Sequence, residues 1–226
     1  MSATHFVDSN GLPNPNHYTS VRDLAILARA WIQNFPQYYP WFGQKWITYN
    51  NIKQPNRNRL LWRDPSVDGM KTGHTDGAGF CLAASALRSD MRLIAIIMGA
   101  PSDTARANDS EALLNYGFRF FESNKLYSAN TPVIAARVYY GKDKNSELGA
   151  TNDIYVTTPV GKDKNVKTYV KFVPNLQAPI KKGDVGGYLI VNFNDKMISS
   201  QPLVALQDNP EGGFFVRLAD HISNLF

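Results

Sequence analysis

The sequence predicts an α+β protein in which an antiparallel sheet flanked by helices is followed by a small all-β domain. Apolar residues recur at helical spacing early in the chain and again over residues 103–121, with apolar runs of strand length between them. From about Ser123 the pattern changes to short alternating segments separated by glycine, proline, asparagine and aspartate. We therefore expect domains at residues 1–121 and 122–210, followed by an amphipathic tail at residues 211–226.

The first helix is predicted to begin at Ser20. A serine hydroxyl accepts backbone N–H groups at a helix start, and Asp23 is favoured in the first turn. The helix should end before Pro36, because proline cannot continue a helix and restricts the residue before it. Five residues at helical spacing form an apolar stripe that we assign to the core: Leu24, Leu27, Ala28, Trp31 and Ile32.

A β-hairpin is predicted around the tripeptide Lys71-Thr72-Gly73. Residues 74–79 have turn composition, and residues 80–87 return as an apolar strand. The tripeptide then lies near the outer edge of a strand pair. Lysine supplies a fixed positive charge there, threonine a hydroxyl donor, and glycine an open approach for a ligand. These groups suit an extended substrate that ends in a carboxylate.

The rest of the first domain is predicted to hold a buried strand over residues 91–99 and the helix over residues 103–121. The apolar residues of that helix expected to face inward are Leu113, Leu114, Phe118 and Phe121. The single cysteine, Cys81, excludes an internal disulfide, and its place in an apolar strand predicts a small core residue.

The all-β domain is predicted from five alternating segments. They span residues 133–140, 153–158, 167–172, 188–193 and 202–206. After them, the last segment places apolar residues on one helical face: Phe215, Leu218, Ile222, Leu225 and Phe226. Such a tail either docks on its own domain or lies in a membrane interface.

Composition narrows the classes of function. The chain is 43% hydrophobic, which is enough for a packed core, and no apolar run is long enough to span a membrane. The net charge of +5 is modest for 226 residues, and the basic cluster at residues 57–63 is typical of a solvated loop. We therefore expect no nucleic-acid partner. The histidines are widely separated, so we predict no metal site, and we expect no cofactor: His5, His17, His74 and His221.

Several strings around the tripeptide occur in the same order as in a known enzyme family. They are His5-Phe6, Gly11-Leu12, Asn58-Arg59-Leu60-Leu61-Trp62, residues 67–75, residues 116–121 and Pro210-Glu211-Gly212. In these strings the chain resembles the D-alanyl-D-alanine carboxypeptidases among the low-molecular-mass penicillin-binding proteins. The resemblance extends over nearly the whole chain. It implies an incomplete β-lactamase/transpeptidase-like fold for the first domain.

The resemblance implies serine acyl transfer on the D-Ala-D-Ala end of a peptidoglycan pentapeptide, with β-lactam antibiotics as ligands of the same site. By position, Lys71 supports the substrate electrostatically and Thr72 bonds its terminal carboxylate. The backbone N–H of His74, after Gly73, contributes to an oxyanion hole. Arg106 matches a family arginine that helps hold the carboxylate. The resemblance also implies a periplasmic protein that lies peripherally on the inner membrane through its tail.

The chain departs from the family in its nucleophile. No serine has a lysine three positions later, so the nucleophile and its partner base are absent from these 226 residues. Ser128-Ala129-Asn130 has the form of the family's second motif but follows the tripeptide, and we treat it as coincidence. We expect the chain to be the C-terminal portion of such an enzyme, completed by an N-terminal segment or a companion chain and inactive alone. The alternatives are a β-lactamase-like hydrolase and a non-catalytic module of the cell envelope.

Overall fold

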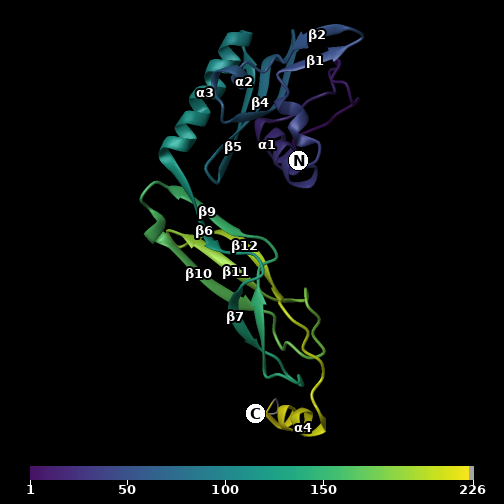
Figure 1. The fold of residues 1–226 in the computed structure, drawn as a ribbon, viewed down its shortest axis with the longest axis vertical. Coiled ribbons are helices and arrows are strands. Elements are labelled where there is room, and N and C mark those ends of the chain that lie inside the picture. Colours follow the sequence, from purple (N-terminus) through teal and green to yellow (C-terminus); the bar gives the residue numbers. More distant parts are fainter. Residues whose placement is uncertain (224–226) are drawn as a thin grey trace. The chain divides into compact units, whose positions relative to one another are not determined.

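The structure is a computed structural model that describes residues 1–223, with side-chain exposure for residues 1–221. The chain divides into two compact units, Met1–Phe120 and Phe121–Phe226. Figure 1 shows that the first unit carries both long helices, whereas strands dominate the second. The α+β class expected from the sequence is confirmed, and so is the β-rich character of the second half.

The first unit is built on a three-stranded antiparallel sheet in the order β3-β4-β5. Its strands are β3 (Val67–Thr75), β4 (Gly79–Arg88) and β5 (Met91–Ala100). Two helices pack on it, α1 (Val21–Asn34) and α3 (Asp103–Phe120). Smaller elements precede the sheet: η1 (Tyr39–Gly43), β1 (Trp46–Tyr49), β2 (Ile52–Pro55) and α2 (Leu60–Arg63).

The two helices cover opposite faces of this sheet. Along β4, Leu82 and Ala84 belong to the cluster that contains residues of α3, whereas Ala83 packs with the cluster around Ala28 of α1. Successive side chains of a strand point to opposite faces, so this alternation places one helix on each side. The sheet is therefore a central layer whose outer strand β3 keeps one free edge among the described residues.

Local signals at α1 and at the hairpin are confirmed. The Ser20 hydroxyl accepts a hydrogen bond from the Asp23 N–H at 3.2 Å, and the helix ends at Asn34, before the proline. β3 and β4 form the predicted hairpin, with Lys71 opposite Ala83 in the ladder. Both features depend on residues close in sequence, which is why the sequence alone located them.

Predictions of burial in the first unit were less accurate. Of the apolar stripe on α1 only Ala28 is buried, and Leu27 is 41% exposed. The strand expected to be buried, β5, buries only Ala95 and Ala100 fully. On α3 the inward face carries Leu114, but Leu113 is 46% exposed, because one residue turns a helix face by about 100°. The inward face continues instead through Arg106, Ala107 and Ser110.

The end of α3 also differs from the prediction. The helix stops at Phe120, and Phe121 begins β6 (Phe121–Tyr127) in place of closing the helix. β6 pairs antiparallel with β9 (Ile154–Pro159). Its sequence, Phe-Glu-Ser-Asn-Lys-Leu-Tyr, alternates too weakly in polarity to predict a strand without its partner.

The second unit contains a five-stranded antiparallel sheet in the order β10-β11-β12-β8-β7. The strands are β7 (Pro132–Arg137), β8 (Asn145–Gly149), β10 (Val166–Phe172), β11 (Val185–Phe193) and β12 (Lys196–Ala205), and η2 (Asp163–Asn165) precedes β10. Four of the five predicted segments begin within three residues of the first residue of an observed strand. The fifth predicted segment begins at residue 202, six residues after the start of β12 at Lys196, and the prediction missed β8. One core cluster holds this unit together, with Val138, Leu148 and Leu203 fully buried.

The C-terminal helix is α4 (Phe214–Ser223). The Asp220 carboxylate accepts a hydrogen bond from the Tyr140 N–H at 2.7 Å and pairs with Arg137, which ties the helix to its unit. Phe214 and Phe215 are 67% and 83% exposed. Leu225 and Phe226 of the predicted apolar face lie outside the described residues, and so does the side chain of Ile222.

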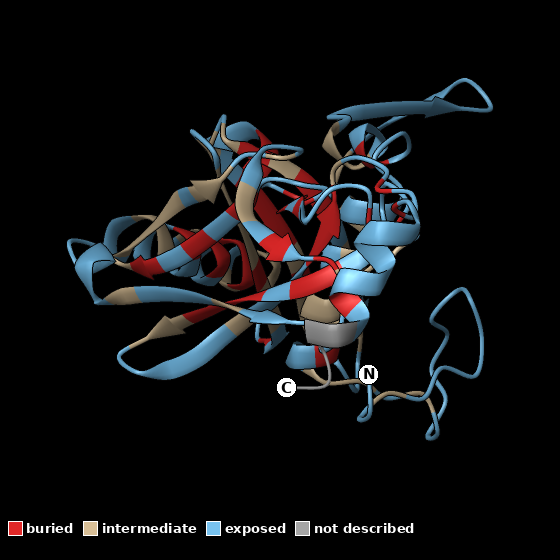
Figure 2. Ribbon diagram, turned by 90° about the horizontal axis from the view of Figure 1, so that it is seen from below, coloured by how far each residue is buried: buried red, intermediate tan, exposed pale blue. Residues whose placement is uncertain are grey.

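No helix in the described part of the chain is both long and apolar enough to cross a membrane. Figure 2 shows the buried residues gathered along the strands, while exposed residues dominate the loops and the helix surfaces.

Candidate functional site

The tripeptide lies on a large open cavity of the first unit, with a volume of about 1430 Å³. One part of the wall is apolar and consists of Leu24, Leu27, Ala28, Trp31 and Phe42. The stripe predicted to be core on α1 is thus largely the wall of this cavity. The polar wall comes from four segments: residues 9–11, the chain between β2 and α2, strand β3, and the first turn of α3.

Lys71, Thr72, Gly73 and His74 all line the cavity, so the structure brings the predicted tripeptide and its neighbour together. The exposed Lys71 ammonium donates to the carbonyl oxygen of Thr72 at 2.6 Å. A Cβ on Gly73 would meet only the Cβ of Cys81, at 3.9 Å. The space beside the Gly73 backbone is therefore open within the protein, and a ligand can approach the strand there.

Arg106 reaches the tripeptide from α3, but its guanidinium is engaged within the protein. The residue is 4% exposed. Its Nη1 donates to the carbonyl oxygens of Gly73 and Cys81 at 3.1 and 3.3 Å, and its Nη2 donates to Asp103. Arg106 also lies over the ring of Phe80, 5.5 Å from its centroid. Arg106, which we expected to bind a ligand carboxylate, therefore hydrogen-bonds to the backbone of β3 and β4 in this structure.

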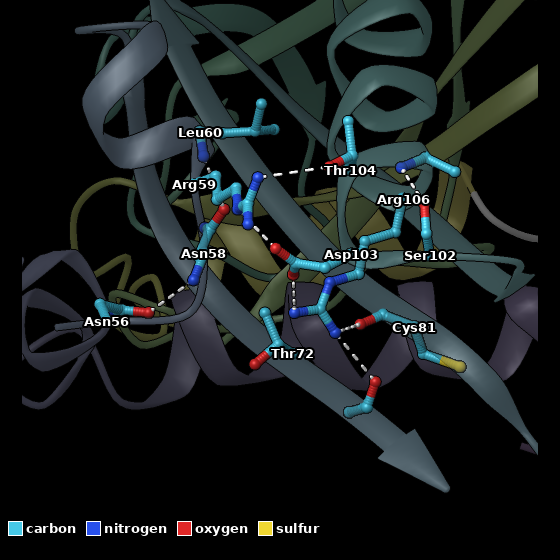
Figure 3. A network of polar contacts seen from close by, with 12 residues as sticks. Asn56, Asn58, Arg59, Leu60, Thr72, Cys81, Ser102, Asp103, Thr104 and Arg106 are labelled. Carbon is cyan, nitrogen blue, oxygen red and sulfur yellow. Dashed lines mark hydrogen bonds and ion pairs between the residues drawn. The ribbon is translucent and has the colours of Figure 1, made fainter. Parts of the chain in front are cut away.

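Asp103 joins two arginines at the start of α3. One carboxylate oxygen accepts from Arg106, and the other pairs with the Nε of Arg59 at 2.5 Å. Arg59 also donates to the Thr104 hydroxyl at 3.3 Å. Figure 3 shows this chain of contacts running from Arg59 through Asp103 and Arg106 to the strand carbonyls.

Arg57 is a cavity residue that sequence reasoning missed. Its neighbour Asn58 is fully buried and donates to the Gly69 carbonyl at 3.0 Å, while Asn56 donates to the carbonyls of Phe42 and Gln44 at 3.2 and 3.0 Å. The backbone is thus fixed on both sides of Arg57, and among the described residues no carboxylate pairs with this exposed guanidinium. The asparagines flanking an arginine were the available signal, but the cluster was interpreted as a solvated loop.

His74 and Cys81 complete this end of the cavity. The exposed His74 ring stacks on Phe80, with centroids 4.0 Å apart. Cys81 is only partly buried, and its thiol lies 3.4 Å from the carbonyl oxygen of Ala78. The prediction of Cys81 as a core residue was wrong, because its side chain lies at the start of β4, where it lines the cavity.

A second polar cluster anchors the start of β3. Arg92 binds the Asp68 carboxylate through two bonds of 2.8 and 2.7 Å, and Tyr39 donates to the same carboxylate at 2.7 Å. Burial raises the pKa of the Tyr39 hydroxyl well above its ordinary value. A Cβ on Gly69 would meet the Tyr39 hydroxyl at 2.6 Å, so this close packing requires glycine. The cluster fixes the strand just before the tripeptide.

One sequence feature that resembles a family motif lies outside the cavity. Ser128-Ala129-Asn130 belongs to the second unit, just before β7, and does not line the cavity. Among residues 1–223, no three His, Cys, Asp or Glu side chains gather as a metal site requires.

Comparison with known proteins places the chain in one family. Residues 1–102 match the family model described as D-alanyl-D-alanine carboxypeptidase, and residues 121–211 match the penicillin-binding protein 5 C-terminal domain. The D-alanyl-D-alanine carboxypeptidase DacC of Escherichia coli is 42% identical over 100% of this chain and 57% of its own length. DacA of Haemophilus influenzae is 44% identical over 97% of this chain and 57% of its own length.

The solved structures agree. Penicillin-binding protein 5 from Haemophilus influenzae superposes with a TM-score of 0.79 at 43% identity, covering 92% of this chain and 61% of that protein. The chain thus spans somewhat more than half the length of these relatives. Because both units match in order and the fold agrees, the chain belongs to the D-alanyl-D-alanine carboxypeptidase family of the penicillin-binding proteins.

Proposed function

We propose that the first unit is the substrate-positioning wall of a serine-type D-Ala-D-Ala carboxypeptidase that removes the terminal D-alanine from peptidoglycan stem peptides. One observation carries the proposal: strand β3 presents Lys71-Thr72-Gly73-His74 along a cavity that also holds Arg57. The relatives are named D-alanyl-D-alanine carboxypeptidases, and this supports the same reaction. β-Lactam antibiotics, which react with such enzymes in place of the peptide, are the second ligand class that we propose.

In this proposal the peptide lies extended beside the edge of β3. An edge strand offers backbone groups to an added strand, and Gly73 leaves its approach open. The Thr72 hydroxyl and the cations of Lys71 and Arg57 hold the terminal carboxylate by charge-assisted hydrogen bonds. Arg106 acts behind the strand, holding the Gly73 carbonyl.

The chemical step divides between this wall and a serine. The serine hydroxyl attacks the penultimate carbonyl carbon, and its proton passes to a base. The oxyanion that forms accepts a hydrogen bond from the His74 N–H. The peptide bond breaks, D-alanine leaves with the proton, and water then hydrolyses the acyl-enzyme. The serine and its base are not among the 226 residues, since no Ser-x-x-Lys occurs in them. This chain supplies positioning and charge stabilisation.

We further propose that the protein acts in the periplasm, peripherally on the inner membrane through its tail at residues 211–226. Phe214, Phe215 and Leu218 are exposed on α4, and apolar side chains on one helix face partition into the headgroup region. Sedimentation with anionic vesicles checks this. Phe215→Glu should abolish cosedimentation, whereas Tyr169→Glu, an equally polar change at an exposed strand residue, should not.

A hybrid enzyme tests the reaction. This chain replaces the matching 57% of DacC, and release of D-alanine from diacetyl-L-Lys-D-Ala-D-Ala is measured. We expect an active hybrid that loses about 100-fold or more in kcat/KM with Thr72→Val or Lys71→Ala, in line with the loss of charge-assisted contacts. A folded hybrid without activity, or one indifferent to both substitutions, contradicts the proposal.

A further inference from the structure

We propose that Asp103, held by Arg59, is a positioning residue that acts through Arg106 to aim the peptide group between Gly73 and His74. The inference deepens the proposed function and rests on it, because that peptide group carries the oxyanion donor. Figure 3 shows the contacts that join Arg59, Asp103 and Arg106 to the Gly73 carbonyl.

Arg106 is hydrogen-bonded to both strands of the hairpin. Its Nη1 donates to Gly73 on β3 and to Cys81 on β4, at 3.1 and 3.3 Å. These two residues are partners in the ladder. One buried nitrogen therefore spans the strand pair at the last residue of the tripeptide, where β3 approaches its turn.

The Gly73 carbonyl and the His74 N–H belong to the same peptide group. In a trans peptide the C=O of one residue and the N–H of the next point in opposite directions. Whatever fixes the Gly73 carbonyl therefore also fixes the direction of the His74 N–H. Because the bond to Gly73 comes from a cation, it also polarises the amide and makes its N–H a stronger donor.

Arg106 is itself held in place by an ion pair with Asp103. The Arg106 side chain is 5% exposed, and Asp103 is the carboxylate that pairs with it. Asp103 is held in turn by Arg59, whose side chain is 52% exposed, and the first turn of α3 is fixed by the Ser102 hydroxyl, which accepts from the Ala105 N–H at 3.0 Å. Removing the Asp103 charge leaves a buried cation without its counter-charge and free to leave the strand carbonyls.

If Asp103 had a purely structural role, its loss would change the stability of the protein but not the direction of the His74 N–H. An acidic residue in the first turn stabilises a helix through its dipole, so its loss would lower stability and leave local geometry unchanged. The test therefore needs a readout of the His74 N–H direction that stability alone does not move. Asp109 offers the matched control, since it lies exposed on the same helix.

The test compares Asp103→Asn with Asp109→Asn in the ¹⁵N-labelled full chain, by N–H residual dipolar couplings and order parameters. We expect the His74 order parameter to fall from about 0.85 toward about 0.6 in Asp103→Asn only. Arg59→Ala should give an intermediate change that Arg59→Lys partly reverses, and it serves as the second variant if Asp103→Asn does not fold. Unchanged His74 couplings in a folded Asp103→Asn or Arg59→Ala protein overturn the proposal.

The DacC hybrid adds the kinetic readout. Asp103→Asn should lower kcat by about tenfold or more with KM little changed, because the oxyanion contact forms in the transition state. A hybrid whose kcat is unaffected contradicts the positioning role. If the unsubstituted hybrid is inactive, the proposed function fails, while the dipolar couplings still decide the positioning role in the isolated chain.

Discussion

The two units of this chain pack their apolar residues in contrasting ways. The second unit closes around one cluster that includes Val138, Leu148 and Leu203, all fully buried. The first divides its buried residues between two clusters on opposite faces of a sheet and leaves α1 side chains such as Leu27 along a cavity. The unit with the candidate site therefore keeps part of its apolar surface for contact with something other than its own core.

The largest expected effect is a core truncation in the second unit. Leu203→Ala should lower the free energy of unfolding by about 2–5 kcal/mol, whereas Leu27→Ala in the cavity wall should cost less than about 1 kcal/mol. The four tryptophans, Trp31, Trp41, Trp46 and Trp62, all lie in the first unit. Tryptophan fluorescence in urea therefore reports that unit, and circular dichroism reports both.

The outcome separates the two units. We expect Leu203→Ala to shift the circular dichroism transition and to leave the tryptophan midpoint in place. Equal shifts of both signals in Leu203→Ala, or the same loss of unfolding free energy in Leu27→Ala as in Leu203→Ala, would contradict the difference between the closed core of the second unit and the open one of the first.

A smaller effect is expected from polar clusters. Asp68→Ala should cost the first unit about 1–3 kcal/mol, because it leaves Arg92 and Tyr39 without their shared acceptor. The exposed pair Lys167–Asp195 in the second unit, whose side chains are 70% and 79% exposed, should contribute under about 0.5 kcal/mol. Urea unfolding of Asp68→Ala and Asp195→Ala measures the difference. Equal costs would show that burial of the Asp68 cluster matters little.

Acid should weaken the first unit through Asp64. Partial burial opposes its ionisation, but hydrogen bonds from Ser66 and Arg88 outweigh burial and hold the pKa of the Asp64 carboxyl below its ordinary value of 3.8. A depressed folded-state pKa stabilises the protein above the unfolded pKa, and this contribution is lost as pH falls below 3.8. Asp64→Asn should reduce the acid sensitivity of the tryptophan transition between about pH 4 and 2. An unaltered pH profile would exclude this role.

The smallest change in stability is expected at Arg57. Arg57→Ala removes an exposed side chain without a carboxylate partner among the described residues, so unfolding should shift by less than about 0.5 kcal/mol. Binding of diacetyl-L-Lys-D-Ala-D-Ala should nevertheless weaken about tenfold, because a charge-assisted bond is lost. Arg63→Ala, a nearby arginine that is not among the cavity residues, is the control. Equal binding by both variants would remove Arg57 from the site.

Local sequence signals predicted much of the fold. The Ser20 cap, the stop before Pro36 and the hairpin around the tripeptide each depend on neighbouring residues. Strand β8 was missed because Asn-Ser-Glu-Leu-Gly is short and polar, and only its partners reveal that Ser146 and Leu148 face the core.

The sequence predicted the tripeptide of the site but not the ion pairs that hold Arg106 behind it. The tripeptide identified β3, and family resemblance brought in Arg106. Nothing in the sequence pairs Arg59 with Asp103, which are far apart in the chain and meet only when α3 packs on the sheet. Long-range ion pairs of this kind have no local pattern, so the structure was needed to show that Arg106 is occupied.

In the proposed function, strand β3 of this chain recognises the D-Ala-D-Ala terminus. The most direct measurement is an NMR titration of the ¹⁵N-labelled full chain with diacetyl-L-Lys-D-Ala-D-Ala, using the L-Ala-L-Ala peptide as control. We predict saturable shifts of the Thr72, Gly73 and His74 amides with the D,D peptide alone. Shifts confined to other regions, or identical shifts with both peptides, would contradict the claim.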